Sequence, residues 1–222
     1  MPITAQRTPR GRRTRGSVAG SSLSQAGGVV EPGAFLQDYA TQLQRLCRPS
    51  ASWITPLIAV KDAVVKAARQ GRKTIIVGNG GSAAIASHVA VDLTKNARIR
   101  AINFNEADLI TCFANDYGYE RWMEKAIEFY GEPGDVLIAI SSGGQSKNVL
   151  NACLAARRRA FASVVTLSGF ASDNPLRRLG DHNFFVESRA YKLVELTHQF
   201  WLLALVDLII GKAEYPASVE SG

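Results

Sequence analysis

Two segments of this 222-residue chain each carry a carboxylate and an imidazole at helical spacing. His88 and Asp92 are four residues apart, so both side chains lie on one face of a helix. Such a pair can be an acid–base dyad, two ligands of a metal ion, or a hydrogen bond on a helix face. The sequence leaves these three interpretations open.

Glu195 and His198 form the second pair, three residues apart in an otherwise apolar segment. A carboxylate and an imidazole buried in hydrocarbon are costly unless they are paired or used in chemistry. The pair is therefore a candidate for proton transfer, and the alternative is a satisfied polar pair at a helix interface.

Two short polar loops, each placed after an apolar run, could hold an anion. The glycines allow close approach of the backbone, and the following helix adds free N–H groups and partial positive charge. Two such loops in one small domain predict a phosphorylated metabolite held between them. The candidate residues are Asn79, Gly80, Gly81 and Ser82 in the first loop and Ser141, Ser142 and Ser146 in the second.

The first loop also fits a dinucleotide-binding fingerprint, G-x-G-x-x-A, over residues 78–83. That interpretation needs an acidic residue at the end of the next strand, but no carboxylate follows until Glu106. The hydroxyl and amide side chains of the loop suit a phosphate monoester better, so no nucleotide cofactor is expected. A purely structural turn remains an alternative.

Alternating apolar runs and helical patterns should position these residues. Runs rich in Val and Ile without alternation are typical of strands buried on both faces, and helices between them predict a parallel sheet. The expected fold is α/β, a doubly wound five-stranded parallel sheet of the flavodoxin-like type, with both loops beyond the carboxyl ends of its strands. Strands are predicted at 74–78, 99–103, 135–140, 162–167 and 182–186, and helices at 83–95, 106–114, 119–130, 146–159 and 190–211.

Composition and charge divide the chain into three parts. The 46% hydrophobic and 20% charged fractions suit one folded domain. This domain is predicted at 34–213, with an N-terminal helical segment at 34–70 that breaks at Pro49-Ser50 and covers the core or an oligomer interface. A basic tail at 1–33 and a short tail at 214–222 flank it.

Five arginines within the first thirty residues carry most of the net charge of +7. The tail that holds them is predicted to be disordered and solvated, with weak nucleic-acid contact or a targeting segment as alternatives. No nucleic-acid partner is expected. The most apolar stretch, 200–210, is too short for a membrane span and contains Asp207. Three cysteines without C-x-x-C spacing indicate reduced thiols and a cytoplasmic location.

The chain resembles the sugar isomerase (SIS) domain family, and more closely its phosphoheptose isomerase branch, over about residues 35–212. The matching segments are GNGGSAAIASHVAVDLT (78–94), FANDYGYE (113–120), GDVLIAISSGGQSKNVLNA (134–152) and VVTLSG (164–169). The resemblance implies a homotetramer with sites at subunit boundaries. It also implies isomerisation of sedoheptulose 7-phosphate to D-glycero-D-manno-heptose 7-phosphate, an enediol reaction that needs an acid and a base.

The resemblance also assigns roles to individual residues. The residues of the first loop, with Asn115 and Asp116, would contact substrate, and the three serines of the second loop would hold phosphate oxygens. His88 matches a family zinc ligand, and Asp92 matches a glutamate that serves as metal ligand and catalytic base. Zinc is therefore a candidate cofactor.

Two departures from the family pattern fall on the last predicted helix. Aligned on Glu195, Val194 replaces a glutamine and Leu202 replaces a catalytic, metal-binding histidine. We therefore expect His198, one turn before Leu202 and aided by Glu195, to act with Asp92 as the acid–base pair in a shifted site. The alternative is a non-catalytic SIS module that binds a sugar phosphate or a protein partner, as in a replication-initiator-associating member of the same branch.

Overall fold

The structure is a computed structural model, and it describes residues 31–215. The predictions for 1–30 and 216–222, which cover most of the two tails, lie outside these residues. The strands are β1 (Thr74–Val77), β2 (Ala101–Ile102), β3 (Val136–Ile140), β4 (Ser163–Gly169) and β5 (His182–Val186). The helices are α1 (Pro32–Cys47), α2 (Ala51–Arg69), α3 (Gly81–Lys95), α4 (Ala107–Tyr117), α5 (Trp122–Tyr130), α6 (Lys147–Arg158), the 3-10 turn η1 (Pro175–Arg178) and α7 (Tyr191–Ile210).

All five strands are parallel and follow the order β2-β1-β3-β4-β5. This is the flavodoxin-like order of a doubly wound sheet, so the predicted fold is confirmed. Every residue of β1, β3 and β4 is buried, which explains their unbroken apolar runs.

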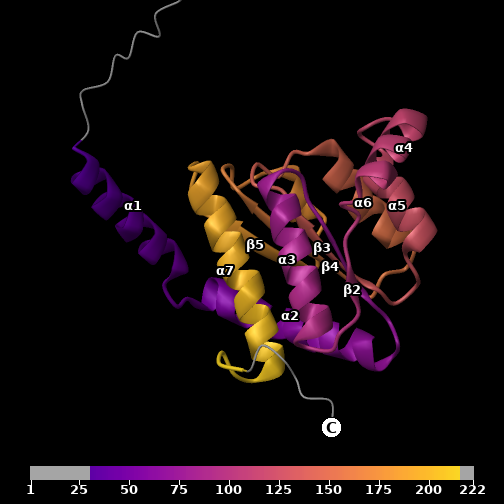
Figure 1. The fold of residues 1–222 in the computed structure, drawn as a ribbon, viewed down its shortest axis with the longest axis horizontal. Helices are drawn as coiled ribbons and strands as arrows, with labels where there is room; N and C mark the ends of the chain where they lie inside the picture. The colour runs from indigo at the N-terminus through magenta and orange to yellow at the C-terminus, as the bar shows by residue number, and fades with distance from the viewer. Residues whose placement is uncertain (1–30, 216–222) are drawn as a thin grey trace, which may run out of the picture.

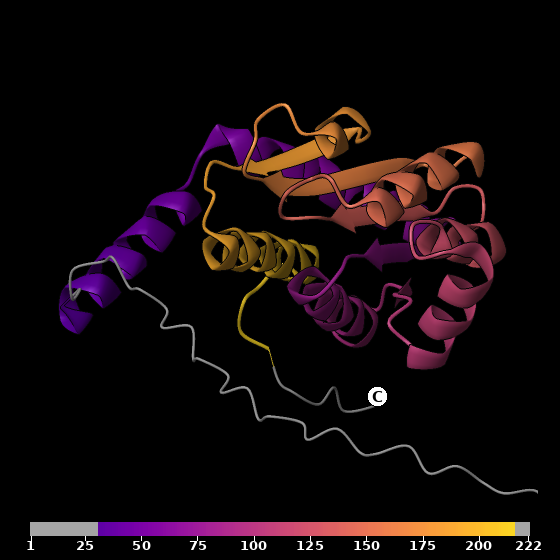
Figure 2. The same cartoon turned by 90° about the horizontal axis from the view of Figure 1, so that it is seen from above.

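Helices cover both faces of the sheet (Figures 1 and 2). Residues of α2, α3 and α7 pack on one face in a cluster that contains Ile76, Ile138 and Trp201. Residues of α5 and α6 pack on the other face, around Leu137 and Met123. The candidate acid–base residues lie on α3 and α7, which pack against each other on the first face.

Helix α1 extends away from the rest of the chain in both views (Figures 1 and 2). It begins at a Glu31 cap and ends just before the predicted break at Pro49-Ser50. None of its residues is buried, and Phe35 and Leu36 are largely exposed. The apolar residues near its start are therefore not covered within residues 31–215, whereas Leu46 near its end packs against the core.

Helix α7 is the one described helix that is long and apolar enough to cross a membrane by length and composition. It is twenty residues long, because it begins well before the 200–210 stretch considered from sequence. Eight of its residues are buried against the sheet and the neighbouring helices. This burial is that of a core helix.

Candidate functional site

The two polar loops lie next to each other because of the strand order. β1 pairs with β2 on one side and with β3 on the other, so chain connections leave β1 and β3 in opposite directions. Ligands of doubly wound sheets bind at this point, beyond the carboxyl ends of the strands. The first loop follows β1 and the second follows β3, as predicted.

A cavity of about 60 Å³ lies between the loops, about twice the volume of a water molecule in the liquid. It connects through shared residues to a cleft of about 640 Å³ that includes Arg189. The cavity is lined from both loops and from α7, by Asn79, Ser82, Ile140, Ser141, Ser142, Ser146, Tyr191 and Glu195. The predicted juxtaposition of the two loops is confirmed.

The second loop presents three hydroxyl groups to this cavity. Ser141 Oγ and Ser146 Oγ lie 3.0 Å apart and bond to each other. Ser142 Oγ is buried and has no hydrogen-bond partner among residues 31–215. Helix α6 follows with Ser146 at its N-cap and no side-chain cap bond, so its first N–H groups are open to an anion. This arrangement suits a phosphate group.

The first loop is tied to α6 by a reciprocal pair of amides. Asn79 Nδ2 donates to Asn148 Oδ1 at 3.0 Å, and Asn148 Nδ2 donates to Asn79 Oδ1 at 2.9 Å. Tyr119 Oη also donates to Asn79 Oδ1, at 3.1 Å. Sequence reasoning missed Asn148 and Tyr119, although both stand inside the segments that match the SIS family. Their polar side chains gave no local signal, because the pairing joins residues far apart in the chain.

Glu195 is placed at the start of α3. A methyl group at Gly81 would lie 2.4 Å from Glu195 Oε1, so the carboxylate sits directly over this glycine. Its side chain is 15% exposed and forms an ion pair with Lys192 at 3.1 Å. The N-terminal end of α3 has no side-chain cap and stabilises the negative charge. The structure thus brings Glu195 into the cavity shared by both loops.

His88 and Asp92 lie farther along α3 and pair as expected from their spacing. His88 Nε2 is 3.3 Å from Asp92 Oδ2, and Gln199 Nε2 is 3.2 Å from His88 Nδ1. In this orientation the amide of Gln199 donates to Nδ1, so the imidazole hydrogen resides on Nε2 and points at the carboxylate. A groove of about 450 Å³ between α3 and α7 is lined by His88, Glu195, Gln199 and Tyr39.

His198 does not reach this groove, and its predicted role in the acid–base pair is wrong. It is fully buried, and its Nε2 lies 3.2 Å from the main-chain oxygen of Ser168 in β4. Leu202, on the same helix face, is also buried in the core. His198 and Leu202 do lie four residues apart on one face of α7, but that face packs on the sheet. Glu195 and Gln199 lie on the face of α7 that points toward α3.

Burial lowers the pKa of His198 to about 4. Because the unfolded chain binds a proton near pH 6.5 and the folded chain does not, stability should fall as pH falls between these values. Between pH 7 and pH 4, the free energy of unfolding of the His198→Leu variant should fall by about 3 kcal/mol less than that of the parent protein. Urea unfolding at both pH values measures this difference. An equal loss in both proteins would contradict the assignment of His198 to the core.

Asn115 and Asp116 are not brought to the cavity or the groove. Both lie in the last turn of α4, are exposed, and bond to each other at 2.9 Å. Helix α4 has no buried residue. Within residues 31–215 these two side chains form no hydrogen bond with either polar loop.

The side chains available as metal ligands do not fit the zinc site that the family resemblance implies. Within the described residues, no group of three or more His, Cys, Asp or Glu side chains comes together. Val194 and Leu202, at the two altered positions, are buried hydrocarbon. His88 and Asp92 supply two donors, whereas protein zinc sites use three or four protein ligands. No chemical step is therefore assigned to a metal.

Comparisons with known proteins add independent information. A family model described as SIS domain matches residues 38–169. The chain is similar to a phosphoheptose isomerase of Roseiflexus sp. (strain RS-1), with 39% identity over 114 residues, 49% of this chain and 58% of that protein. It is also similar to a phosphoheptose isomerase of Fusobacterium nucleatum subsp. nucleatum, with 32% identity over 143 residues, 62% of this chain and 73% of that protein. The chain thus spans 58 to 73% of the length of these two relatives.

Solved structures agree with the sequence matches. The fold is similar to the structure of phosphoheptose isomerase from Neisseria gonorrhoeae, with a TM-score of 0.72 and 25% identity. That similarity covers 80% of this chain and 96% of the solved chain.

Proposed function

Because the chain belongs to the SIS domain family, in its phosphoheptose isomerase branch, we propose that it isomerises sedoheptulose 7-phosphate to D-glycero-D-manno-heptose 7-phosphate. The observation that carries this proposal is that Glu195 lines both the serine-lined cavity and the α3–α7 groove, which extends to His88. His88 in turn pairs with Asp92.

The distance from the cavity to His88 fits the substrate. Carbons 1 and 2 of a heptose 7-phosphate lie five or six C–C bonds from carbon 7, or roughly 6–8 Å, because a zigzag of bonds of about 1.5 Å advances less than the bond length at each step. His88 lies seven residues after Gly81 in α3, or roughly 10 Å at about 1.5 Å rise per residue. With the phosphate in the cavity between the two loops, the reacting carbons would lie toward His88, and Glu195, which lines both the cavity and the groove, would face the hydroxyls between them.

Proton transfer is assigned to the His88–Asp92 pair. When the substrate displaces the amide of Gln199, the lone pair of His88 Nδ1 accepts the proton from one carbon and returns it to its neighbour. Asp92 holds Nε2–H and stabilises the imidazolium formed in between. A second proton moves between the two oxygens of the enediol. Phosphate binding supplies remote energy that positions the reacting carbons.

The proposal includes a homotetramer in the cytoplasm. Two helices without buried residues, α1 and α4, support association with further copies. Association could also bring Asn115 and Asp116 of a neighbouring copy to the groove, as the family pattern implies. Three free cysteines, Cys47, Cys112 and Cys153, support a reducing compartment.

A direct assay tests the proposal. Purified protein, with its mass measured by light scattering, is incubated with sedoheptulose 7-phosphate, and the aldose product is followed by NMR. We expect turnover by a species of about four chains, and unchanged turnover after dialysis against a chelator, because the donor set does not fit zinc. Absence of turnover together with binding of the sugar phosphate would support the alternative, a non-catalytic SIS module. Loss of turnover after chelation would contradict the expectation that no metal is needed, but it would leave the isomerase proposal in place.

A further inference from the structure

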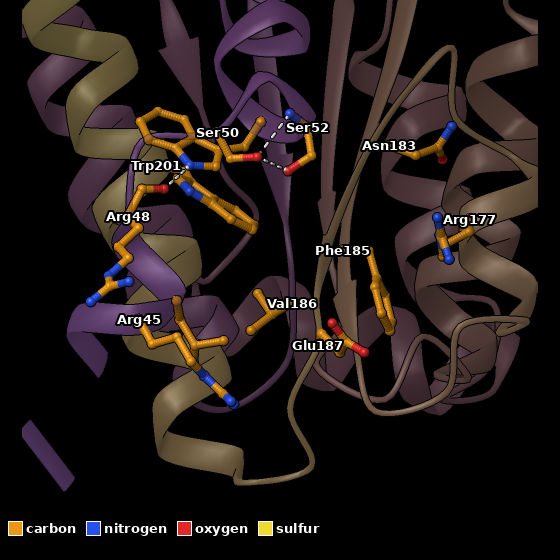
Figure 3. Close-up of a pocket in the computed structure, with 12 residues that line it drawn as sticks. Arg45, Arg48, Ser50, Ser52, Arg177, Asn183, Phe185, Val186, Glu187 and Trp201 are labelled. Atoms are coloured by element: carbon orange, nitrogen blue, oxygen red, sulfur yellow. Dashed lines mark hydrogen bonds between the residues drawn. The ribbon is translucent and has the colours of Figure 1, made fainter. Parts of the chain in front are cut away.

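A cavity of about 750 Å³ lies at the edge strand β5 and not at the proposed substrate site. It is lined by the junction of α1 and α2, by η1 and by β5 (Figure 3). None of its lining residues takes part in the loop cavity, the cleft beside it, or the α3–α7 groove. The isomerase proposal therefore leaves this cavity without a role.

The main chain of β5 has a free edge in this cavity. β5 pairs with β4 alone among the described strands. Ser141 N–H of the loop after β3 donates to Leu167 O at 3.1 Å, so the odd-numbered residues of β4 bond to β3 and its even-numbered residues bond to β5. In the register Val165↔His182, the main chain of His182 and Phe184 therefore bonds to β4, and the N–H and C=O groups of Asn183 and Phe185 point away from it. These groups can pair with an added strand.

Arginines flank this edge on both sides. Figure 3 shows Arg45 and Arg48 on one side of β5 and Arg177 on the other. Within residues 31–215, Arg45 and Arg48 form no ion pair, and the guanidinium of Arg177 lies 4.6 Å from the centre of the Phe185 ring. Glu187, at the end of β5, is the one carboxylate among the described lining residues. A single phosphate group could not contact arginines on opposite sides of the strand.

We propose that the edge of β5 binds an extended acidic peptide of another protein as an added strand. Successive side chains of a strand point to opposite faces, so acidic side chains of such a peptide would meet Arg45 and Arg48 on one face and Arg177 on the other. Main-chain pairing with β5 would supply affinity, and the arginines would select for negative charge. The charge complementarity identifies the occupant as an acidic segment.

Labelled peptides test the proposal by fluorescence anisotropy on the full-length protein. The probe is the octapeptide Glu-Glu-Val-Val-Glu-Glu-Val-Val, which places Glu on both faces of a strand, and its charge control is the same peptide with Lys in place of Glu. A third peptide has the acidic sequence with every amide N-methylated, so that it keeps its charge but cannot donate a main-chain hydrogen bond from either edge. We expect binding of the first peptide alone, and at least tenfold weaker binding by the double variant Arg45→Glu and Arg48→Glu.

Several outcomes would overturn the proposal. Arginines on an edge can also serve to prevent pairing between copies, and in that case the acidic peptide would not bind. Equal binding of the N-methylated peptide, or displacement by inorganic phosphate at matched ionic strength, would indicate a site for small anions. An altered mass of the double variant by light scattering would indicate that this edge joins copies of the chain. Retained isomerase turnover in the variant shows that it is folded.

Discussion

Replacing His88 with glutamine should lower kcat/KM for sedoheptulose 7-phosphate by about 10²- to 10⁴-fold, the usual contribution of a positioned acid–base group. Glutamine keeps a polar side chain of similar length beside Asp92, but it cannot accept a proton from carbon. The effect should fall mainly on kcat, because the phosphate contacts of the second loop remain. Steady-state kinetics with NMR detection of the aldose measures the change.

His182 offers a matched control, since it starts β5 and contacts none of the proposed substrate groups. His182→Gln should leave kcat/KM within about twofold of the parent enzyme. Asp92→Asn should lower kcat less than His88→Gln does, because it weakens the support of the imidazole without removing the base. A His88→Gln variant with parental kcat would assign the proton transfer to another group.

The Gly144→Ala substitution should destabilise the protein by about 3 kcal/mol or more. Gly144 has φ +65°, where a side chain costs about 1–2 kcal/mol. A methyl group there would also lie 2.1 Å from Oδ1 of the buried Asn174. The amide of Asn174 donates to Ser168 and Ala171, so displacing it leaves buried polar groups unpaired, at about 1–3 kcal/mol.

Gly211→Ala is the matched control for this substitution. Gly211 also has a positive φ, +87°, but a methyl group would meet no atom within 4 Å. We expect a loss of only about 1–2 kcal/mol there. Urea unfolding of both variants at one protein concentration gives the comparison, and binding of inorganic phosphate should weaken in Gly144→Ala alone. Equal destabilisation at both positions would show that the crowding at Asn174 relaxes at little cost.

The parallel sheet and the paired loops were predictable because buried strands and glycine-rich turns leave local patterns. The apolar runs that became β1 and β3 fixed the place of each loop, and the strand order placed the loops together. The pairing of His88 with Asp92 followed from helical spacing alone. These features depend on residues close in the chain.

The role of His198 was mispredicted for a physical reason. Helix α7 is apolar on nearly every side, so its sequence does not indicate which face packs on the sheet and which faces α3. Gln199, the residue that does contact His88, lies one position later. The amide pair of Asn79 and Asn148 and the arginines around β5 were also missed, because they combine residues from distant parts of the chain.

The amide pair also bears on how this site can change over generations. Asn79 and Asn148 each use a donor and an acceptor on the other, so a mutation of either one leaves its partner with an unmatched amide. Viable descendants should therefore tend to keep both asparagines or to replace both. The first loop and the start of α6 would then be inherited as a single unit.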